Sequence, residues 1–150
     1  MYMKVRIDHY AANPDIYRAM SQLEKQVTAS GLDRVIYELV KIRASQINGC
    51  AFCLDMHTKE LRKLGESEQR INLISVWRES PCYTDQEKAV LELTEAVTLI
   101  AERGVPQDVF DRVRSFYSEK ETMDLIFAIN VINCWNRIAI STGMFPGCRD

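Results

Sequence analysis

The sequence predicts an all-α protein, a bundle of about six to seven helices in one domain over residues 1–150. Apolar residues recur mostly at the three- and four-residue spacing of a helix face. Glycine and proline fall between these periodic segments rather than inside them. The alternating stretch Lys4–Ile7 is short, so we expect an extended arm there and no sheet. A chain of 150 residues is long enough to bury a single solid core.

Capping residues delimit the first three expected helices. Asn13 can cap the first, and Pro14 suits its first turn. Gly49 ends the second, because glycine readily takes the left-handed conformation that closes a helix. The third opens directly after this glycine. The expected bounds are residues 13–31, 33–47 and 50–65.

Four further helices are expected in the second half of the chain. Ser67 can cap the first of them, and Pro81 interrupts the chain after it. Thr84 and Glu87 have the spacing of a capping box ahead of a long amphipathic run. The last helix is apolar around much of its girth, so it must be covered on more than one side, within the bundle, at a subunit interface or both. The expected bounds are residues 67–79, 84–104, 106–117 and 119–142.

Composition and charge exclude several classes of protein. The formal net charge is -2, and basic residues are scattered among acidic ones, so no broad positive field attracts nucleic acid. Residues 1–8 lack the apolar segment of a signal peptide. The longest apolar stretches are interrupted by Asn130 and Asn133 and fall short of the roughly 20 residues that span a membrane. We therefore expect a cytoplasmic protein with neither nucleic acid nor membrane as a partner.

The chain contains five cysteines. An odd number excludes a fully paired intrachain framework and suits a reducing compartment, where thiols are catalytic, metal-binding or buried. Their spacing has to distinguish these possibilities.

A cluster of reactive side chains follows one face of the third expected helix. Cys50, Cys53 and His57 are three and four residues apart, so they are neighbours along that face. The two cysteines can approach closely enough for a reversible disulfide. His57 can take the thiol proton of Cys53 or stabilise the thiolate, and the helix start favours an anion as well. Both effects lower a thiol pKa, and only the thiolate attacks a peroxide or disulfide usefully.

Glu38 lies on the preceding helix, among apolar neighbours at helical spacing. If the second and third helices pack as an antiparallel hairpin, Glu38 can approach His57 and orient or protonate it. The predicted relay runs from Glu38 through His57 to Cys53. Alternatively, Arg34 or Lys41, at i-4 and i+3, pairs with Glu38 at the surface.

Other polar and sulfur-containing residues receive structural interpretations. Cys82, Cys134 and Cys148 have no matching partners, so a packing or incidental role is expected for them. His9 is expected at the polar surface. A polar line in the last helix is expected to serve hydrogen bonding and packing, with a contribution to the active-site wall or a subunit contact as the alternative; it consists of Asn130, Asn133 and Asn136.

The set formed by Glu38, Cys50, Cys53 and His57, with its spacing, resembles the alkylhydroperoxidase AhpD and carboxymuconolactone decarboxylase family. The resemblance extends over about residues 32–143, and residues 130–137 resemble the late helix of short peroxidase-related members. The paired cysteines indicate the redox branch, because the decarboxylase branch lacks them. Phe52 departs from the pattern, since the best-studied members carry a second histidine between the cysteines.

The resemblance implies an all-α fold, homo-trimers or hexamers, and reduction of an alkyl hydroperoxide at the cysteine pair, without cofactor or metal. In that scheme Cys53 attacks the peroxide, and its sulfenic acid condenses with Cys50. A dithiol donor, dihydrolipoamide or a thioredoxin-like protein, restores the pair. The helix-terminus argument alone favours Cys50 as the low-pKa thiol. We favour Cys53, because His57 is directly within its reach.

Three other functions remain open from the sequence. The first is thiol–disulfide exchange on lipoyl or protein disulfides without peroxidase activity. The second is zinc binding or redox sensing, with Cys50, Cys53 and His57 as ligands and Glu38 as the fourth ligand that tetrahedral zinc requires. The third is decarboxylase or lactone chemistry on the same scaffold, which does not depend on thiols.

Overall fold

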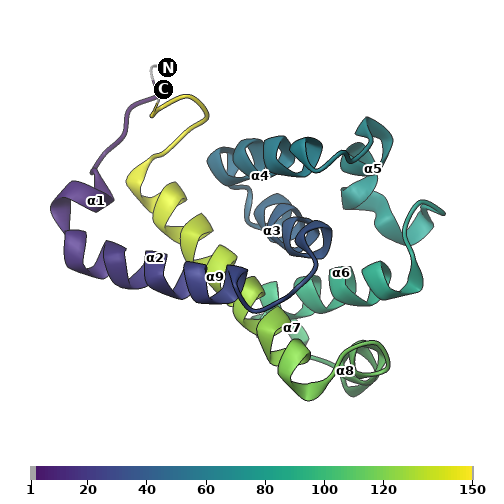
Figure 1. Cartoon of the computed structure of the whole chain (residues 1–150). Helices are drawn as coiled ribbons and strands as arrows, with labels where there is room; N and C mark the ends of the chain where they lie inside the picture. The colour runs from purple at the N-terminus through teal and green to yellow at the C-terminus, as the bar shows by residue number, and fades with distance from the viewer. Residues whose placement is uncertain (1–2, 150) are drawn as a thin grey trace.

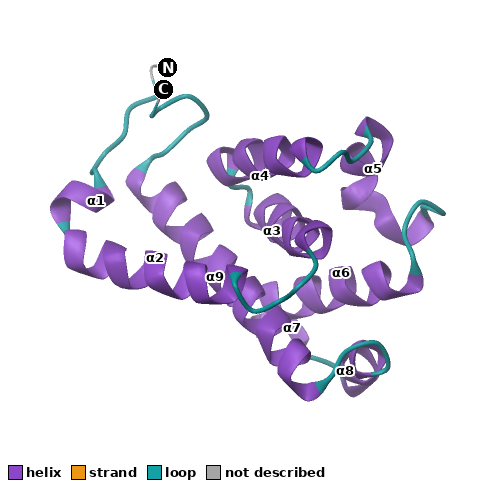
Figure 2. Ribbon diagram, in the orientation of Figure 1, coloured by secondary structure: helices purple, strands orange, loops and turns teal. Residues whose placement is uncertain are grey.

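A computed structural model describes residues 3–149 (Figure 1). Within this range the chain forms nine α-helices and one 3-10 helix and no strand (Figure 2). The predicted domain includes residues 1, 2 and 150, and the N-terminal segment includes the first two of them. These three residues lie outside the described residues. In chain order the elements are α1 His9–Ala12, α2 Pro14–Thr28, α3 Arg34–Asn48, α4 Ala51–Lys63, α5 Glu68–Leu73, η1 Ile74–Glu79, α6 Asp85–Thr98, α7 Ile100–Arg103, α8 Gln107–Arg114 and α9 Glu119–Thr142.

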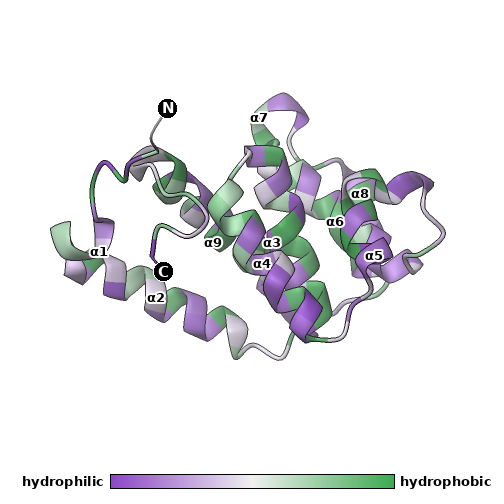
Figure 3. Cartoon of the chain, turned by 90° about the horizontal axis from the view of Figure 1, so that it is seen from above, coloured by the Kyte–Doolittle hydropathy of each residue, from purple (hydrophilic) through white to green (hydrophobic). Residues whose placement is uncertain are grey.

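The helix α3 lies at the centre of the bundle. It packs against α4, α9 and α6 (Figure 1), and Leu39, Val40 and Ile42 in its middle are 0% exposed. The helix α2 lies to one side of this bundle and packs on α9 (Figure 3). This arrangement confirms the all-α prediction and places α3 and α4 as neighbours.

Local capping signals fix most helix boundaries where the sequence predicts them. The Asn13 side chain accepts a hydrogen bond from the Ile16 N–H at the start of α2. Gly49 adopts φ 70° at the end of α3. The Thr84 and Glu87 capping box forms at the start of α6, with both hydrogen bonds present. The bounds of α9 coincide with the predicted residues 119–142.

The expected number of helices is too low. The segment predicted as one helix over residues 67–79 is α5 followed by a 3-10 helix, with Val76 outside helical geometry at φ -123°. The segment predicted over residues 84–104 divides at Leu99 into α6 and α7. The short helix α1 has no predicted counterpart, and Asp8 caps it by accepting the N–H groups of Tyr10 and Ala11.

The helix α9 is long and apolar enough to cross a membrane by length and composition alone. It nevertheless packs against α3, α6 and α2. Leu125, Ala128, Ile129 and Ile132 on it are 0% exposed. The long core helix of a helical bundle meets the same compositional test, and we describe α9 as that core helix.

The expected extended arm runs beside the end of α9. The Arg6 N–H donates to the Thr142 carbonyl at 2.8 Å. Gly143, at φ 77°, ends α9, and a Cβ at this position would lie 3.0 Å from the Lys4 carbonyl oxygen. Glycine therefore permits both the turn and the close approach of the arm.

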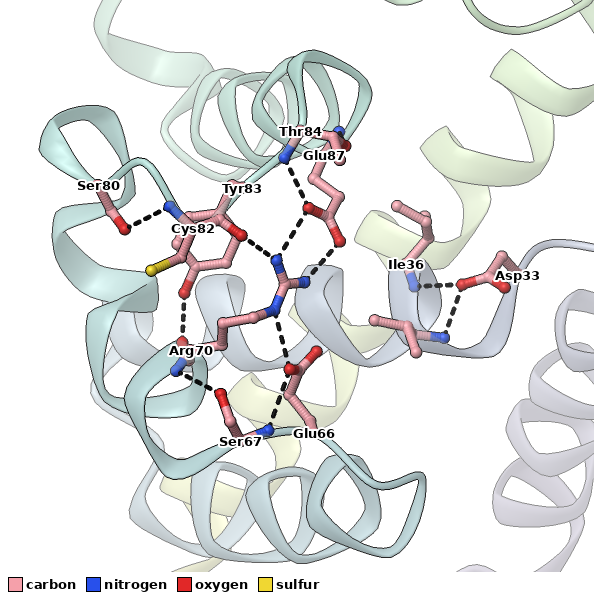
Figure 4. A network of polar contacts seen from close by, with 11 residues as sticks. Asp33, Ile36, Glu66, Ser67, Arg70, Ser80, Cys82, Tyr83, Thr84 and Glu87 are labelled. Carbon is pink, nitrogen blue, oxygen red and sulfur yellow. Dashed lines mark hydrogen bonds and ion pairs between the residues drawn. The ribbon is translucent and has the colours of Figure 1, made fainter.

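A polar network joins α5 to the start of α6 (Figure 4), on the side of the bundle away from α2 (Figure 1). Arg70 donates to Glu66 at 2.8 Å and to Glu87 at 2.6 Å. The Tyr83 hydroxyl donates to the Arg70 carbonyl, and the guanidinium of Arg70 lies 4.8 Å from the Tyr83 ring centroid. These contacts tie the connection between the two helices to the bundle.

Candidate active site

The connection between α3 and α4 places the cysteine pair at a helix start. After Gly49, the Cys50 N–H donates to the Ser45 carbonyl at 3.0 Å. Cys50 is the N-cap of α4, with extended backbone angles, and its sulfur accepts the N–H of Cys53 at 3.4 Å. An N-cap acceptor satisfies one of the free N–H groups at the helix start. Sulfur here performs the role that an oxygen acceptor usually performs.

The two thiols are buried, at 2% exposure each, and influence one another. The hydrogen bond from the Cys53 side chain, with contributions from the Cys53 N–H and Asn136, lowers the pKa of Cys50 to about 7 against the effect of burial. The hydrogen bond to Cys50, burial and the charge on Cys50 raise the pKa of Cys53 above its ordinary value. This order is the opposite of the one we favoured from His57. The main reason is the hydrogen bond between the two thiols, which favours the charged form of Cys50 and the neutral form of Cys53; the backbone N–H groups that Cys50 receives at the helix start act in the same direction on Cys50.

Glu38 and His57 meet as predicted. The Glu38 Oε2 atom lies 2.8 Å from His57 Nδ1, and the residues are 8% and 7% exposed. Because a carboxylate can only accept, Nδ1 carries the proton and Nε2 is left as the basic atom of the neutral ring. The alternative of surface pairing is wrong, since Lys41 pairs with Glu24 and Arg34 is exposed.

The final step of the predicted relay, from His57 to Cys53, stays a prediction. Within the described residues, the side-chain hydrogen bond of His57 leads to Glu38, while Cys53 interacts with Cys50 and Asn136. Both His57 and Cys53 nevertheless line one pocket. A substrate in that pocket would contact both groups.

The pocket has a volume of about 390 Å³ and lies between α2, α4 and the end of α9. Its lining includes Cys53 and does not include Cys50. Apolar and aromatic side chains dominate the wall, among them Phe52, Met56 and Trp135. Such a wall suits the organic part of a small molecule. Of the two motif cysteines, Cys53 is therefore the one that belongs to the pocket wall.

The polar line in α9 contributes to the support of the cysteines. Asn136 is 0% exposed. Its amide donates to Ser45 Oγ at 3.0 Å and accepts from Asn48 at 2.9 Å. Its side chain also lowers the pKa of both motif cysteines. Asn133 accepts from Asn48 as well, at 2.9 Å. These contacts agree with the expected role in hydrogen bonding and packing, and neither Asn133 nor Asn136 is among the residues that line the pocket.

Asn130 differs from the other members of that line. It is exposed, and its amide donates to the Ile126 carbonyl at 2.8 Å within the same helix. The polar line therefore divides into two buried members and one at the surface.

A cluster around Glu24 was missed by the sequence reasoning. Glu24 on α2 accepts from Lys41 and Tyr37, and from Trp135 Nε1 at 3.1 Å. Burial alone would raise the pKa of Glu24, but the charge of Lys41 and these hydrogen bonds lower it. The position of Lys41, three residues after Glu38 on the same face, is the signal that could have indicated it.

His9 and the remaining cysteines differ in their relation to the pocket. His9 was expected at the polar surface, but it lines the pocket, and its ring centroid lies 5.4 Å from that of Tyr17. Cys82, Cys134 and Cys148 are free thiols outside the pocket lining. Cys134 is exposed, and the other two are partly buried.

The zinc alternative is not favoured by this geometry. It required Cys50, Cys53, His57 and Glu38 to converge on one point. Among residues 3–149, no group of three or more histidine, cysteine or acidic side chains is placed to hold a metal ion. His57 instead turns its Nδ1 atom to Glu38.

Comparison with known proteins gives similarity along most of the chain. The sequence profile of the carboxymuconolactone decarboxylase family matches residues 14–96. The uncharacterised protein YdfG of Bacillus subtilis is 47% identical over 141 residues, which are 94% of this chain and 96% of that protein. A crystal structure from Agrobacterium tumefaciens is 51% identical, with a TM-score of 0.92, and covers 95% of this chain and 99% of its own. That protein is described as one of unknown function and a candidate antioxidant defence protein AhpD.

A named enzyme matches a smaller part of the chain. Alkyl hydroperoxide reductase AhpD of Hyphomonas neptunium is 36% identical over 67 residues. This alignment covers 44% of the present chain and 37% of the AhpD protein. The chain thus matches little more than a third of the length of that relative.

Proposed function

The chain belongs to the AhpD and carboxymuconolactone decarboxylase family, and from that premise we propose that it is a thiol-dependent hydroperoxide reductase in antioxidant defence. The observation that carries the proposal is the position of Cys53. It lines an apolar pocket together with His57, while the second motif cysteine lies directly behind it. An organic hydroperoxide in this pocket would meet a thiol, a base and a resolving thiol in one place.

The first step is ionisation of Cys53. The Nε2 atom of His57 takes the thiol proton, and the resulting imidazolium is stabilised by the Glu38 carboxylate, 2.8 Å from Nδ1. A base is required because the neighbouring Cys50 raises the pKa of Cys53. Glu38 and His57 together supply that base in a buried position.

The second step forms the sulfenic acid. The Cys53 thiolate attacks the terminal peroxide oxygen, so that an S–O bond forms and the O–O bond breaks. The sulfur is oxidised and the peroxide reduced. The departing alkoxide takes the proton that His57 holds and leaves as an alcohol, which returns the imidazole to its neutral form.

Resolution follows at Cys50. In the resting protein the pKa of this thiol is lowered to about 7, chiefly by the hydrogen bond from the Cys53 thiol, so Cys50 is the more readily ionised member of the pair. Its thiolate attacks the Cys53 sulfenic sulfur, forming the disulfide and releasing hydroxide. A dithiol donor, dihydrolipoamide or a thioredoxin-like protein, then reduces the bridge by exchange. In this scheme Cys53 is the thiol that meets the hydroperoxide in the pocket, and Cys50 is the thiol with the lower pKa that resolves the sulfenic acid.

A second candidate function is thiol–disulfide exchange without peroxidase activity. The low pKa of Cys50 within a Cys-x-x-Cys motif favours it. The pocket admits a small disulfide such as lipoamide more readily than a folded protein, because both thiols are only 2% exposed. Peroxide dependence separates the two functions.

The test is oxidation of a dithiol donor followed with and without an alkyl hydroperoxide. The proposal expects a rate that rises with hydroperoxide and a Cys50–Cys53 bridge detected by mass spectrometry. A rate independent of the hydroperoxide would favour disulfide exchange. An activity on lactone or decarboxylation substrates that survives alkylation of both motif cysteines would favour the decarboxylase branch instead.

Assembly is a separate part of the proposal. The family resemblance implies a homo-trimer or hexamer, and α9 offers exposed apolar residues such as Met123 and Phe127. Light scattering coupled to size-exclusion chromatography measures the oligomer mass directly. A monomer at micromolar concentration would contradict the expected assembly.

A further inference from the structure

Lys41 is a buried cation in the wall of the pocket. It is 4% exposed and lines the same space as Cys53 and His57. Lysine is almost never buried so completely unless its charge is paired. Its ammonium contacts Glu24 and lies 4.1 Å from the centroid of the Tyr37 ring.

The Glu24 carboxylate has partners other than Lys41. Its carboxylate also accepts hydrogen bonds from the Tyr37 hydroxyl and Trp135 Nε1. Three donors therefore share one negative charge. An ammonium has three N–H donors, of which one is directed at Glu24. The Lys41 ammonium, held between Glu24 and the face of the Tyr37 ring, thus places a positive charge in the wall of the space that Cys53 and His57 also line.

The proposed reaction creates negative charge next to Lys41. Glu38 and the ionised Cys50 are already negative on the protein side, and the reaction adds charge first on Cys53 and then on the departing oxygen. The Lys41 charge acts to lower the pKa of Cys53 against the larger effects of Cys50 and burial. The other charged or titratable groups around the pocket come from α1, α2, α3, α4 and the C-terminal segment, and are His9, Tyr17, Glu24, Lys25, Tyr37, Glu38, Cys50, His57 and Arg149.

We propose that Lys41 is the cation that stabilises the negative charge passing from the Cys53 sulfur to the departing oxygen, with Glu24 as the residue that positions it. The proposal rests on the proposed peroxidase function and adds a group to it. As the S–O bond forms and the O–O bond breaks, the Lys41 ammonium faces the oxygen that becomes the alkoxide. Lys41 keeps its proton throughout, and the alkoxide receives its proton from His57. Fixed charge at a developing oxyanion is an effective form of catalysis in a buried site.

The test compares Lys41→Met with Lys63→Met. Lys63 on α4 is exposed and lies outside the pocket lining, so its loss removes an equal charge without altering the pocket. Lys41→Met is expected to reduce the second-order rate with an alkyl hydroperoxide by about 100-fold. Lys63→Met is expected to change it by less than about threefold, because an exposed charge is screened. Lys41→Arg should recover most of the rate.

A second readout needs no peroxide. In a Cys50→Ser background, peptide-resolved alkylation gives the pH dependence of the Cys53 thiol alone. Adding Lys41→Met should move its midpoint upward by about one pH unit, and adding Lys63→Met should not. If hydroperoxide turnover is absent in the unmodified protein while this shift is present, the proposed function fails and the charge role of Lys41 stands.

A double variant distinguishes the proposed charge role of Lys41 from a role in folding alone. Glu24→Gln combined with Lys41→Met leaves no uncompensated buried charge, so folding measured by thermal unfolding is expected to approach that of the unmodified chain. Under the proposal, the double variant remains about 100-fold slow. Recovery of the hydroperoxide rate and of the Cys53 midpoint together with stability would overturn it.

Discussion

Glu38 Oε2 and His57 Nδ1 lie 2.8 Å apart, joining the middle of α3 to the middle of α4 in the interior of the bundle. This contact fixes the tautomer of the imidazole and directs its basic Nε2 atom away from Glu38. It is also the contact on which the proposed ionisation of Cys53 depends.

Glu38→Gln should slow the reaction with hydroperoxide by about 100-fold, because a neutral amide stabilises the imidazolium less well. The measurement is the second-order rate of peroxide consumption with a saturating dithiol donor. Glu60→Gln is the matched control, since Glu60 on α4 is close enough to sense His57 but pairs with Lys63. We expect that control to change the rate by less than about twofold. Equal losses in both variants would contradict a specific role for Glu38.

Cys53→Ser should abolish trapping of a sulfenic acid by a dimedone-type reagent after peroxide treatment. Cys50→Ser should leave the trapped adduct on Cys53, because the resolving thiol is missing and the intermediate persists. Peptide mass spectrometry locates the adduct. The opposite result is an adduct on Cys50 in the Cys53→Ser protein and no adduct in Cys50→Ser. It would show that Cys50 attacks the peroxide and that Cys53 is the resolving thiol.

The pKa of Cys50 predicts a pH dependence of stability. This pKa is lowered from 9.0 to about 7 in the folded chain, so between these values the unfolded chain holds a proton that the folded chain has lost. The free energy of unfolding should therefore rise with pH across this window, and the contribution should disappear as the pH falls through about 7. Denaturant titrations at several pH values, under reducing conditions, measure it. The slope should flatten in Cys50→Ser, and an unchanged slope would refute the assignment.

Asn136→Ala should destabilise the protein by about 1–3 kcal/mol, because Ser45 and Asn48 lose a buried partner. Asn130→Ala is the control on the same helix. It is exposed, and its amide donates within its own helix, so we expect a change within about 0.5 kcal/mol. Urea unfolding gives both values. Similar small changes in the two variants would show that the buried amide network contributes little.

The sequence determined the elements that depend on neighbouring residues. Caps and helix breakers are read within one or two turns, which is why Asn13, Gly49 and Thr84 mark real boundaries. The same local spacing places Cys50, Cys53 and His57 on one helix face, and the hairpin across Gly49 brings Glu38 to His57. The division at Leu99 and the 3-10 segment at Val76 were missed, because neither position carries a proline or glycine to indicate a break.

Only the tertiary structure decided how this motif is surrounded. Glu24 meets Lys41 and Trp135 from three different helices, and Asn136 reaches Ser45 across 91 positions of the chain. These partners set the charge in the pocket wall, and Asn136 and Lys41 both act to lower the pKa of Cys53 against the larger effects of Cys50 and burial. Helix periodicity indicates which face of a helix is buried, but the packing of helices against one another selects the side chains that meet there.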